Sequence, residues 1–544
     1  MRYYEAPSNV PKVARRSGME PVRVPGVRFR PAAVPRARMF DAARTDRLSG
    51  SWPTEPLSAD QIVMRNQRVL VARSREQAAN NDYMKGYLRL VGLHVVGPQG
   101  IRLQSQAMGS SGKPDEPARR AVEKAWGEWG KPANCCVRGR RSWRAIQRLA
   151  ARSAAMNGEF MIRIVRGKAG GPWSFALQVL DPQRCPVALV EHDLPGGGYI
   201  RCGIEFTALG RPVAYLFSTT NEAEADRHYG QRSYVRVPAE EIVHGFLEEF
   251  EGQSRGLPWA ATAMWRMSML SGFEKAALVN ARVGAAKSGF FEWREGYEPQ
   301  FEGEGADEGE AREPLSMEAE PGSFEELPVG LSFKEFSPSY PAGELAPFLK
   351  AMLRGASTGL GVAYNALAND LEGVNFSSIR QGVLDEREHW QELQEWFVEA
   401  LCQPVFDAWL DVALLSGRIR INDVVPVQAS RRAKYAAVRW QPRRWAWIDP
   451  VKDVKAARDA QLGLMSTPGQ AIREAGGDPE TVFREFKGDL DAMQAAGLPD
   501  WLIAQAFQSK TAAPGGAPPA PPPADDDDEG DDDGAQADDE ADEG

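Results

Sequence analysis

Apolar positions in the first half of the chain follow two periods, one typical of helices and one typical of strands. Residues 58–92 repeat apolar side chains at helical spacing, and Asn80-Asn81-Asp82 predicts a break between two helices. β-branched and aromatic residues dominate four later stretches, which predict strands: 158–166, 173–182, 196–219 and 234–246. The third stretch contains Gly210 as a turn between paired strands. We therefore expect an α+β unit over residues 58–250.

The pattern changes at Leu257, where small side chains become frequent. Residues 257–291 are rich in Ala, Gly, Ser and Met, and Pro258 suits the first turn of a helix. A helix of thirty residues would be about 45 Å long, and its small side chains would let other helices approach closely. An acidic, glycine-rich stretch and short strand-like pieces follow up to Tyr340, which we interpret as a small inserted module.

Helical periodicity then returns and is interrupted by a polar loop. The first helix places Lys350 and Arg354 one turn apart on one face. The loop and the start of the next helix read NDLEGVNFSSIRQGVLDE, residues 369–386, in which Ser378 and Gln381 fit a capping box. Because glycine permits backbone angles that are closed to other residues, Gly373 predicts a flexible loop that ends where the helix begins.

The helix after this loop is predicted to be very long. Its apolar positions recur every four residues and form one stripe: Leu393, Phe397, Leu401, Val405 and Trp409. Pro404 should kink or interrupt this helix, because proline removes a backbone donor and clashes with the preceding turn. Residues 445–486 predict two shorter helices.

Charge is distributed unevenly along the chain. The net charge is −10, but thirteen Asp and Glu lie between Asp525 and Glu543, and no Lys or Arg follows Lys510. Residues 1–510 therefore hold all 65 basic residues and 62 of the 75 acidic ones, a net charge of +3. A near-neutral bulk is not typical of a strongly basic nucleic-acid binder. Residues 1–38, a Pro- and Arg-rich arm, and residues 511–544 lack periodicity and predict disordered termini.

Motifs that carry chemistry are sparse. The five Cys form no CxxC pair and the five His never lie at ligand spacing, so the sequence predicts no metal site and no disulfide framework. Reduced thiols in a cytosolic compartment fit best. A phosphate-binding loop and an HExxH helix are absent, so we expect no cofactor. The sequence has no apolar secretory core and no stretch of eighteen uncharged apolar residues, so no membrane contact is expected.

One motif leaves an enzymatic alternative open. GQSRG at 252–256 matches the G-x-S-x-G turn of many hydrolases, which would make Ser254 a nucleophile with His389 as the downstream base. Leu257 and Pro258 intervene before the predicted helix. A chance match in a loop is therefore the favoured interpretation.

The order of these pieces resembles the tailed-phage portal proteins, and among them the lambda-like portal family. The stretches that carry the resemblance run from MFDAARTDRLSGSW (39–52) through RVPAEEIVHGF (236–246) and GQSRGLPWAATAM (252–264) to NDLEGVNFSSIRQGVLDE (369–386), and end with residues 447–486. No single string is specific alone, but their order and spacing are. The basic arm and the acidic tail lie outside the resemblance.

The resemblance implies an α+β multidomain portal fold with named parts. These are an α+β wing (39–256), a first stem helix (257–288), a small α/β clip (289–341), a second stem helix (342–358), a tunnel loop (359–376), and a long helix that returns to the wing and a helical crown (377–510).

The resemblance also implies the function. A portal protein forms a dodecameric ring at one capsid vertex, where it is a conduit for packaging and ejection of double-stranded DNA without sequence specificity. Its implied partners are further copies of itself, the terminase large subunit, the major capsid and scaffold proteins and head-completion proteins. The ring is expected in the virion after assembly in the host cytoplasm. Another ring-forming head–tail connector or minor capsid protein is the nearest alternative.

Six residues are candidates for lining the DNA channel. Lys350, Arg354 and Arg380 could make sparse phosphate contacts, and Gly373, Asn375 and Ser377 belong to the implied tunnel loop. An ordinary exposed charge or an ordinary surface loop is the alternative at each position.

Overall fold

The computed structural model describes residues 47, 53–219, 234–285, 289–294, 329–335, 342–372, 376–445, 450–474, 477–499 and 501–502. The chain divides into two compact units between Ser58 and Ala59, and every element named below belongs to the second. The termini predicted to be disordered, 1–38 and 511–544, lie outside the described residues. None of the helices in the described ranges has the length and apolar character needed to cross a membrane.

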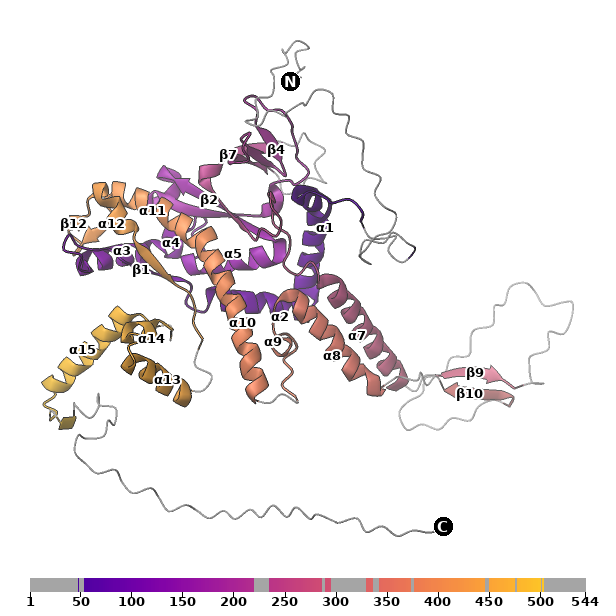
Figure 1. Cartoon of the computed structure of the whole chain (residues 1–544). Helices are drawn as coiled ribbons and strands as arrows, with labels where there is room; N and C mark the ends of the chain where they lie inside the picture. Colours follow the sequence, from indigo (N-terminus) through magenta and orange to yellow (C-terminus); the bar gives the residue numbers. More distant parts are fainter. Residues whose placement is uncertain are drawn as a thin grey trace, which may run out of the picture. The chain divides into compact units, whose positions relative to one another are not determined.

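Helices run through the whole of the second unit (Figure 1). In chain order they are α1 (Ala59–Asn80), α2 (Asp82–Val91), α3 (Glu116–Trp129), α4 (Pro132–Cys135), α5 (Trp143–Asn157), α7 (Met264–Ala285), α8 (Ala342–Leu360), α9 (Tyr364–Ala368), α10 (Phe376–Phe397), α11 (Gln403–Leu415), α12 (Arg432–Ala436), α13 (Pro450–Leu462), α14 (Pro468–Glu474) and α15 (Pro479–Ala495). Two wider π-helical turns, Gly92–Val96 and Val398–Cys402, extend α2 and join α10 to α11.

The strands form small antiparallel sheets. The strands are β1 (Arg102–Ser105), β2 (Glu159–Arg166), β3 (Phe175–Leu180), β4 (Tyr199–Arg201), β5 (Ile204–Phe206), β6 (Pro212–Ser218), β7 (Tyr234–Pro238), β8 (Ile242–Phe246), β9 (Gly289–Trp293), β10 (Leu331–Glu335), β11 (Arg420–Ile421), β12 (Val425–Pro426) and β13 (Val438–Gln441). Within the described residues they make a β3-β2-β8 sheet, a β4-β5-β6-β7 sheet and the pairs β1-β13, β9-β10 and β11-β12.

Strand β2 separates two hydrophobic cores. Successive residues of a strand point to opposite faces, so Phe160, Ile162 and Ile164 enter the main core on the side of α5, whereas Met161 enters a smaller core with residues of β5 to β8. Burial of both faces explains why this strand is an almost continuous apolar run in the sequence. We refer to the elements around these two cores, α1 to α5 and β2 to β8, as the α+β body.

Tryptophans fill the centre of the main core. Trp126 and Trp129 of α3 lie 4.6 Å apart between ring centroids, and Trp126 meets Trp409 of α11 edge-on at 5.0 Å. The Trp129 indole nitrogen donates to the Phe175 carbonyl at 3.0 Å, so its one polar group is satisfied. This cluster packs α11 against α3, although the two helices are nearly 300 residues apart in the sequence.

Several elements confirm the sequence predictions. α1 ends at Asn80, and the Asn81 side chain caps α2 by accepting a hydrogen bond from the Met84 amide at 2.9 Å. Gly210 has a φ of 82° in the turn between β5 and β6. The predicted interruption at Pro404 is also found, because a π-helical turn precedes it and α11 begins at Gln403.

One predicted boundary is wrong. α7 begins at Met264, not near Pro258, and its 22 residues are about 33 Å long. The backbone amide of Trp259 donates to the Ala155 carbonyl at 3.1 Å, which ties this segment to α5 and delays the helix. The sequence analysis also assigned no element to α3 or α5, whose buried faces consist largely of alanine and tryptophan.

Candidate functional site at the helical hairpin

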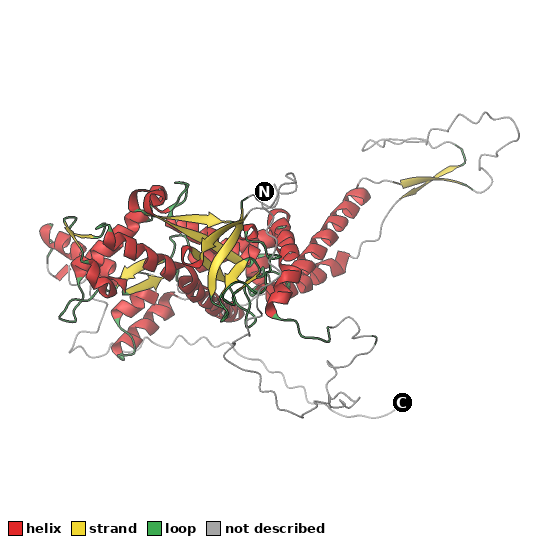
Figure 2. Cartoon of the chain, turned by 90° about the horizontal axis from the view of Figure 1, so that it is seen from above, coloured by secondary structure: helices red, strands yellow, loops and turns green. Residues whose placement is uncertain are grey.

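Helices α7 and α8 form a hairpin that extends from the α+β body (Figure 2). Glycines let the two helices approach closely near the body. The Thr262 hydroxyl, just before α7, donates to the Gly359 carbonyl of α8 at 3.2 Å. The Arg266 guanidinium occupies the space where a side chain at residue 355 would lie, and residue 355 is glycine. The two helices do approach closely, as predicted, but the glycines at this contact belong to α8 and not to the small-residue stretch 257–291.

The two predicted cations of α8 contact one aromatic ring. Lys350 Nζ is 5.7 Å and Arg354 Cζ is 5.6 Å from the ring centroid of Tyr364 on α9. Lys350 also pairs with Asp370, Nζ to Oδ2, at 3.0 Å, and the Tyr364 hydroxyl donates to the same oxygen at 2.7 Å. The charge of Lys350 is therefore balanced by a carboxylate, whereas Arg354 makes no ion pair within the described ranges.

The hydrogen bonds in this cluster fix the charges of its members. The Tyr364 hydroxyl, the Glu372 backbone amide and Lys350 lower the pKa of Asp370 to about 2. Burial and the hydrogen bond to Asp370 raise the pKa of Tyr364 to about 12. At neutral pH Asp370 is thus ionised and Tyr364 is neutral. The arrangement can offer one guanidinium on an aromatic ring to an anion, with little excess positive charge.

The remaining channel candidates are less completely described. Gly373 and Asn375 lie outside the described residues. Ser377 and Arg380 lie in the first turns of α10. The predicted capping box is wrong: α10 begins at Phe376, which places Ser378 inside the helix, and Gln381 donates to Asp385 at 2.8 Å instead of reaching back.

A buried ion pair anchors the chain where the body leads into α7. Arg255 and Glu159 are both fully buried, and two nitrogens of the guanidinium contact both carboxylate oxygens at 2.8 and 2.6 Å. The other donors of Arg255 bond the carbonyls of Pro182, Cys185 and Cys202 at 2.8 to 3.0 Å. All five N–H groups of the guanidinium are therefore satisfied without water.

Glu159 receives further hydrogen bonds from two other elements of the body. The Gln67 amide on α1 donates to Oε1 at 3.0 Å, and His244 Nε2 contacts Oε2 at 2.9 Å. Burial would raise the pKa of Glu159, but Arg255 and the hydrogen bonds from His244 and Arg255 outweigh it and hold the pKa at about 2. Burial lowers the pKa of His244, which keeps the imidazole neutral. Since a carboxylate only accepts, the His244 hydrogen is on Nε2.

The same segment rules out the hydrolase alternative. The Ser254 hydroxyl donates to Asp60 Oδ2 at 2.9 Å and its backbone amide donates to Oδ1 at 2.8 Å, so Ser254 binds the first turn of α1. No histidine is among its partners in the described structure; His389 lies against Gly361, at the end of α8. A strand-to-helix elbow is also absent from this stretch, because β8 ends at Phe246 and α7 begins at Met264.

The glycines of GQSRG have a structural role. A side chain on Gly256 would lie 2.1 Å from the Gly158 carbonyl oxygen, so the two backbones touch beside the ion pair. The motif was visible in the sequence, but the roles of Arg255 inside it and of Glu159 at the start of β2 were not predicted. Two signals were available: the arginine within the glycine motif and the glutamate at the start of an apolar strand. Charges in apolar surroundings need partners, so each of these two residues could have been expected to have one.

The described residues include His, Cys, Asp and Glu, the side chains from which metal sites and disulfides are built. No group of three His, Cys, Asp or Glu side chains is placed to hold a metal ion there. All five cysteines are buried and none is paired.

Comparisons with known proteins find a matching family model and similar chains. Residues 45–394 match a family model described as "Phage portal protein, lambda family". The "Probable portal protein" of Halomonas phage phiHAP-1 is 32% identical over 468 residues, which cover 85% of this chain and 88% of the relative. "Portal protein B" of Escherichia phage lambda is 22% identical over 497 residues, which cover 84% and 90%. A solved structure, "Neck of native GTA particle computed with C12 symmetry", aligns at 17% identity with a TM-score of 0.38 and covers 80% of this chain and 99% of that one.

Replacing Arg255 with Met should destabilise the body strongly. The variant leaves Glu159 buried without its counter-charge, and breaking such a pair typically costs about 3–5 kcal/mol. The matched control is Arg236→Met, which breaks the exposed Arg236–Glu205 pair and should cost less than about 1 kcal/mol. Urea unfolding monitored by tryptophan fluorescence measures both. Equal losses in the two variants would contradict a structural role for the buried pair.

Stability should also fall with pH because of His244. Its pKa is 6.5 when exposed and lower in the folded protein, so below pH 6.5 the unfolded state binds a proton that the folded state does not. The stabilisation is therefore present above pH 6.5 and is lost as the pH falls. His244→Gln keeps a donor toward Glu159 without a titrating ring and should flatten the decline between pH 6.5 and 5. An identical pH profile in the variant and the wild type would refute this assignment.

Proposed function

This chain belongs to the lambda family of phage portal proteins, and from that premise we propose that it assembles into a ring, of twelve copies, through which double-stranded DNA enters and leaves the capsid. Membership in the family makes the chain a structural component of the virion and confirms that it is not an enzyme. The finer assignments below are inferences for this chain.

An exposed apolar face on α7 is the observation that carries the proposal of self-assembly. Trp265, Met269 and Val279 are 71%, 60% and 57% exposed. Spacings of four and fourteen residues place the three on one side of a helix. Large apolar side chains that gather on an exposed face mark an interaction site. In a ring, the neighbouring copy covers this face of the hairpin.

The charges of α8 suit a conduit. Each phosphate that a protein neutralises adds salt-dependent affinity, and strong affinity would retard moving DNA. Lys350 is balanced by Asp370, which leaves Arg354 as a sparse contact. In this proposal Arg354 and Arg380 contact phosphates, Gly373 and Asn375 belong to the tunnel loop in front of α10, and Ser377 faces the channel from the first turn of α10.

The parts of the chain receive portal names on the same basis. The wing is 39–256, and the stem segments are 257–288, in which helix α7 begins at Met264, and 342–358. The clip is 289–341, the tunnel loop is 359–376, and residues 377–510 return to the wing and form the crown. The proposed partners are the terminase large subunit, the major capsid and scaffold proteins and head-completion proteins.

Changing Trp265 and Met269 to Glu should prevent ring formation without unfolding the subunit. Both side chains are exposed in the subunit, so folding tolerates the charges, whereas an apolar interface does not. Negative-stain images and sedimentation measure assembly. Leu209→Glu is the control, because Leu209 is 98% exposed and away from α7. Normal rings from the double variant would show that this face is not the interface.

Deleting residues 369–374 should leave rings assembled but impair packaging or retention of DNA. The deletion shortens the loop proposed to face the channel and spares the apolar face of α7. DNA protected from nuclease in assembled particles provides the measurement. If rings with the deletion package and retain DNA at the wild-type level, the loop does not act on DNA.

A further inference from the structure

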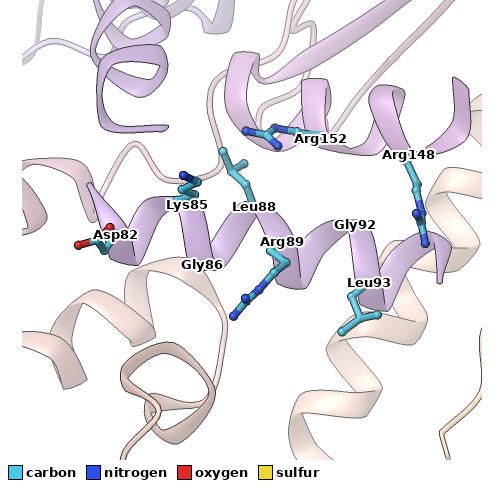
Figure 3. Close-up of a pocket in the computed structure, with 9 residues that line it drawn as sticks. All are labelled: Asp82, Lys85, Gly86, Leu88, Arg89, Gly92, Leu93, Arg148 and Arg152. Atoms are coloured by element: carbon cyan, nitrogen blue, oxygen red, sulfur yellow. The ribbon is translucent and has the colours of Figure 1, made fainter. Parts of the chain in front are cut away.

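A basic hollow lies between α2 and α5 (Figure 3). It has a volume of about 590 Å³, and four cations line it: Lys85, Arg89, Arg148 and Arg152. Asp82 is its one acidic lining residue. Arg148 donates to the Gly97 carbonyl, whereas Lys85, Arg89 and Arg152 make no ion pair within the described part of the chain.

A second basic hollow adjoins the first, because Arg152 lines both. It has a volume of about 870 Å³ between α1, α5 and β3. Its further cations are Arg68, Arg75, Arg138, Arg141 and Arg184. Asp181 is its one acidic lining residue and is paired with Arg75 at 2.6 Å. Together the two hollows gather nine cations and two carboxylates.

The charge of this surface favours the binding of a flexible polyanion. Clustered like charges repel one another, and an anionic partner that spans several of them relieves this repulsion. Guanidinium groups bind carboxylates and phosphates through two parallel N–H donors. The residues of the hollows come from separate elements, so the occupant must run along the surface rather than fill one small pocket.

We propose that the acidic tail of this chain, residues 525–543, docks in the two basic hollows and covers them until DNA competes for them. The tail carries thirteen carboxylates and no cation, so its negative charge complements the excess positive charge of the hollows. Residues 503–524 connect it to the last described residue and can span up to about 70 Å when extended. Because the tail is tethered, its effective concentration at the hollows reaches the millimolar range.

Free DNA is the competing anion, and the tether favours the tail over it. Phosphate contacts weaken steeply as salt rises and depend on the concentration of DNA. The tail is present at every subunit whatever the DNA concentration. Its docking would reduce nonspecific DNA binding outside the channel.

Carbodiimide cross-linking of the full chain tests the contact. This reagent joins a carboxylate to an amine that touches it, and Lys85 offers the amine in the first hollow. Trypsin then releases the tail as one peptide, 511–544, because no Lys or Arg follows Lys510. The tail should be cross-linked to Lys85 when the reaction is run at low salt and should not be cross-linked when it is run in 1 M NaCl, where charges are screened beyond about 3 Å. Equal cross-linking to the exposed Lys113 and Lys168 would overturn the proposal.

A DNA-binding measurement tests the consequence in the full-length chain. Changing the thirteen tail carboxylates to amides should raise the affinity for a duplex of random sequence by about tenfold or more at low salt. Adding K85Q, R89Q and R152Q should abolish this gain, whereas the control K113Q, R120Q and K168Q should preserve it. No gain from the neutral tail, or a gain that survives the hollow variant, would refute docking at this site. Ring assembly is not required for either result.

Discussion

The buried ion pair between Arg255 and Glu159 fixes how the hairpin leaves the α+β body. Two charges in an apolar interior are tolerable only when every donor and acceptor is matched. Here all five N–H groups of Arg255 have acceptors. Glu159 also accepts hydrogen bonds from Gln67 of α1 and His244 of β8. The pair thus ties α1, β2, β8 and the loops after β3 and β4 to the segment that precedes α7. A change in the direction of that segment would leave a charge buried alone.

This anchor explains how a hairpin with few contacts of its own can have a defined direction. α7 and α8 pack against each other near the body through Gly355 and Gly359, while α7 exposes Trp265 and Met269 in its first turns and Val279 farther along. An isolated hairpin of this kind would be unstable in water. The body supplies the fixed base, and in the proposed ring a neighbouring copy supplies the missing cover. Stability and assembly therefore depend on the same few residues at the junction.

The sequence predicted those features that local physical chemistry determines. Stretches of β-branched and aromatic residues identified β2 and β3, Asn81 marked the break between the first two helices, and Pro404 marked the interruption before α11. Contacts between distant segments were not predictable from the sequence. The residues around Glu159 do not indicate that Arg255, 96 residues later, is its partner, and those around Lys350 do not indicate that Asp370 balances its charge. The GQSRG motif was visible, but only the contact of Ser254 with Asp60 shows that it binds a helix start rather than a substrate.

We propose that copies of this chain close into a ring by covering the exposed face of α7. Single-particle cryo-electron microscopy of the purified full-length chain tests it most directly. The account predicts closed rings with rotational symmetry in which Trp265 and Met269 are buried against the neighbouring subunit. Rings in which these side chains face solvent, or a protein that stays monomeric at micromolar concentration, would contradict it.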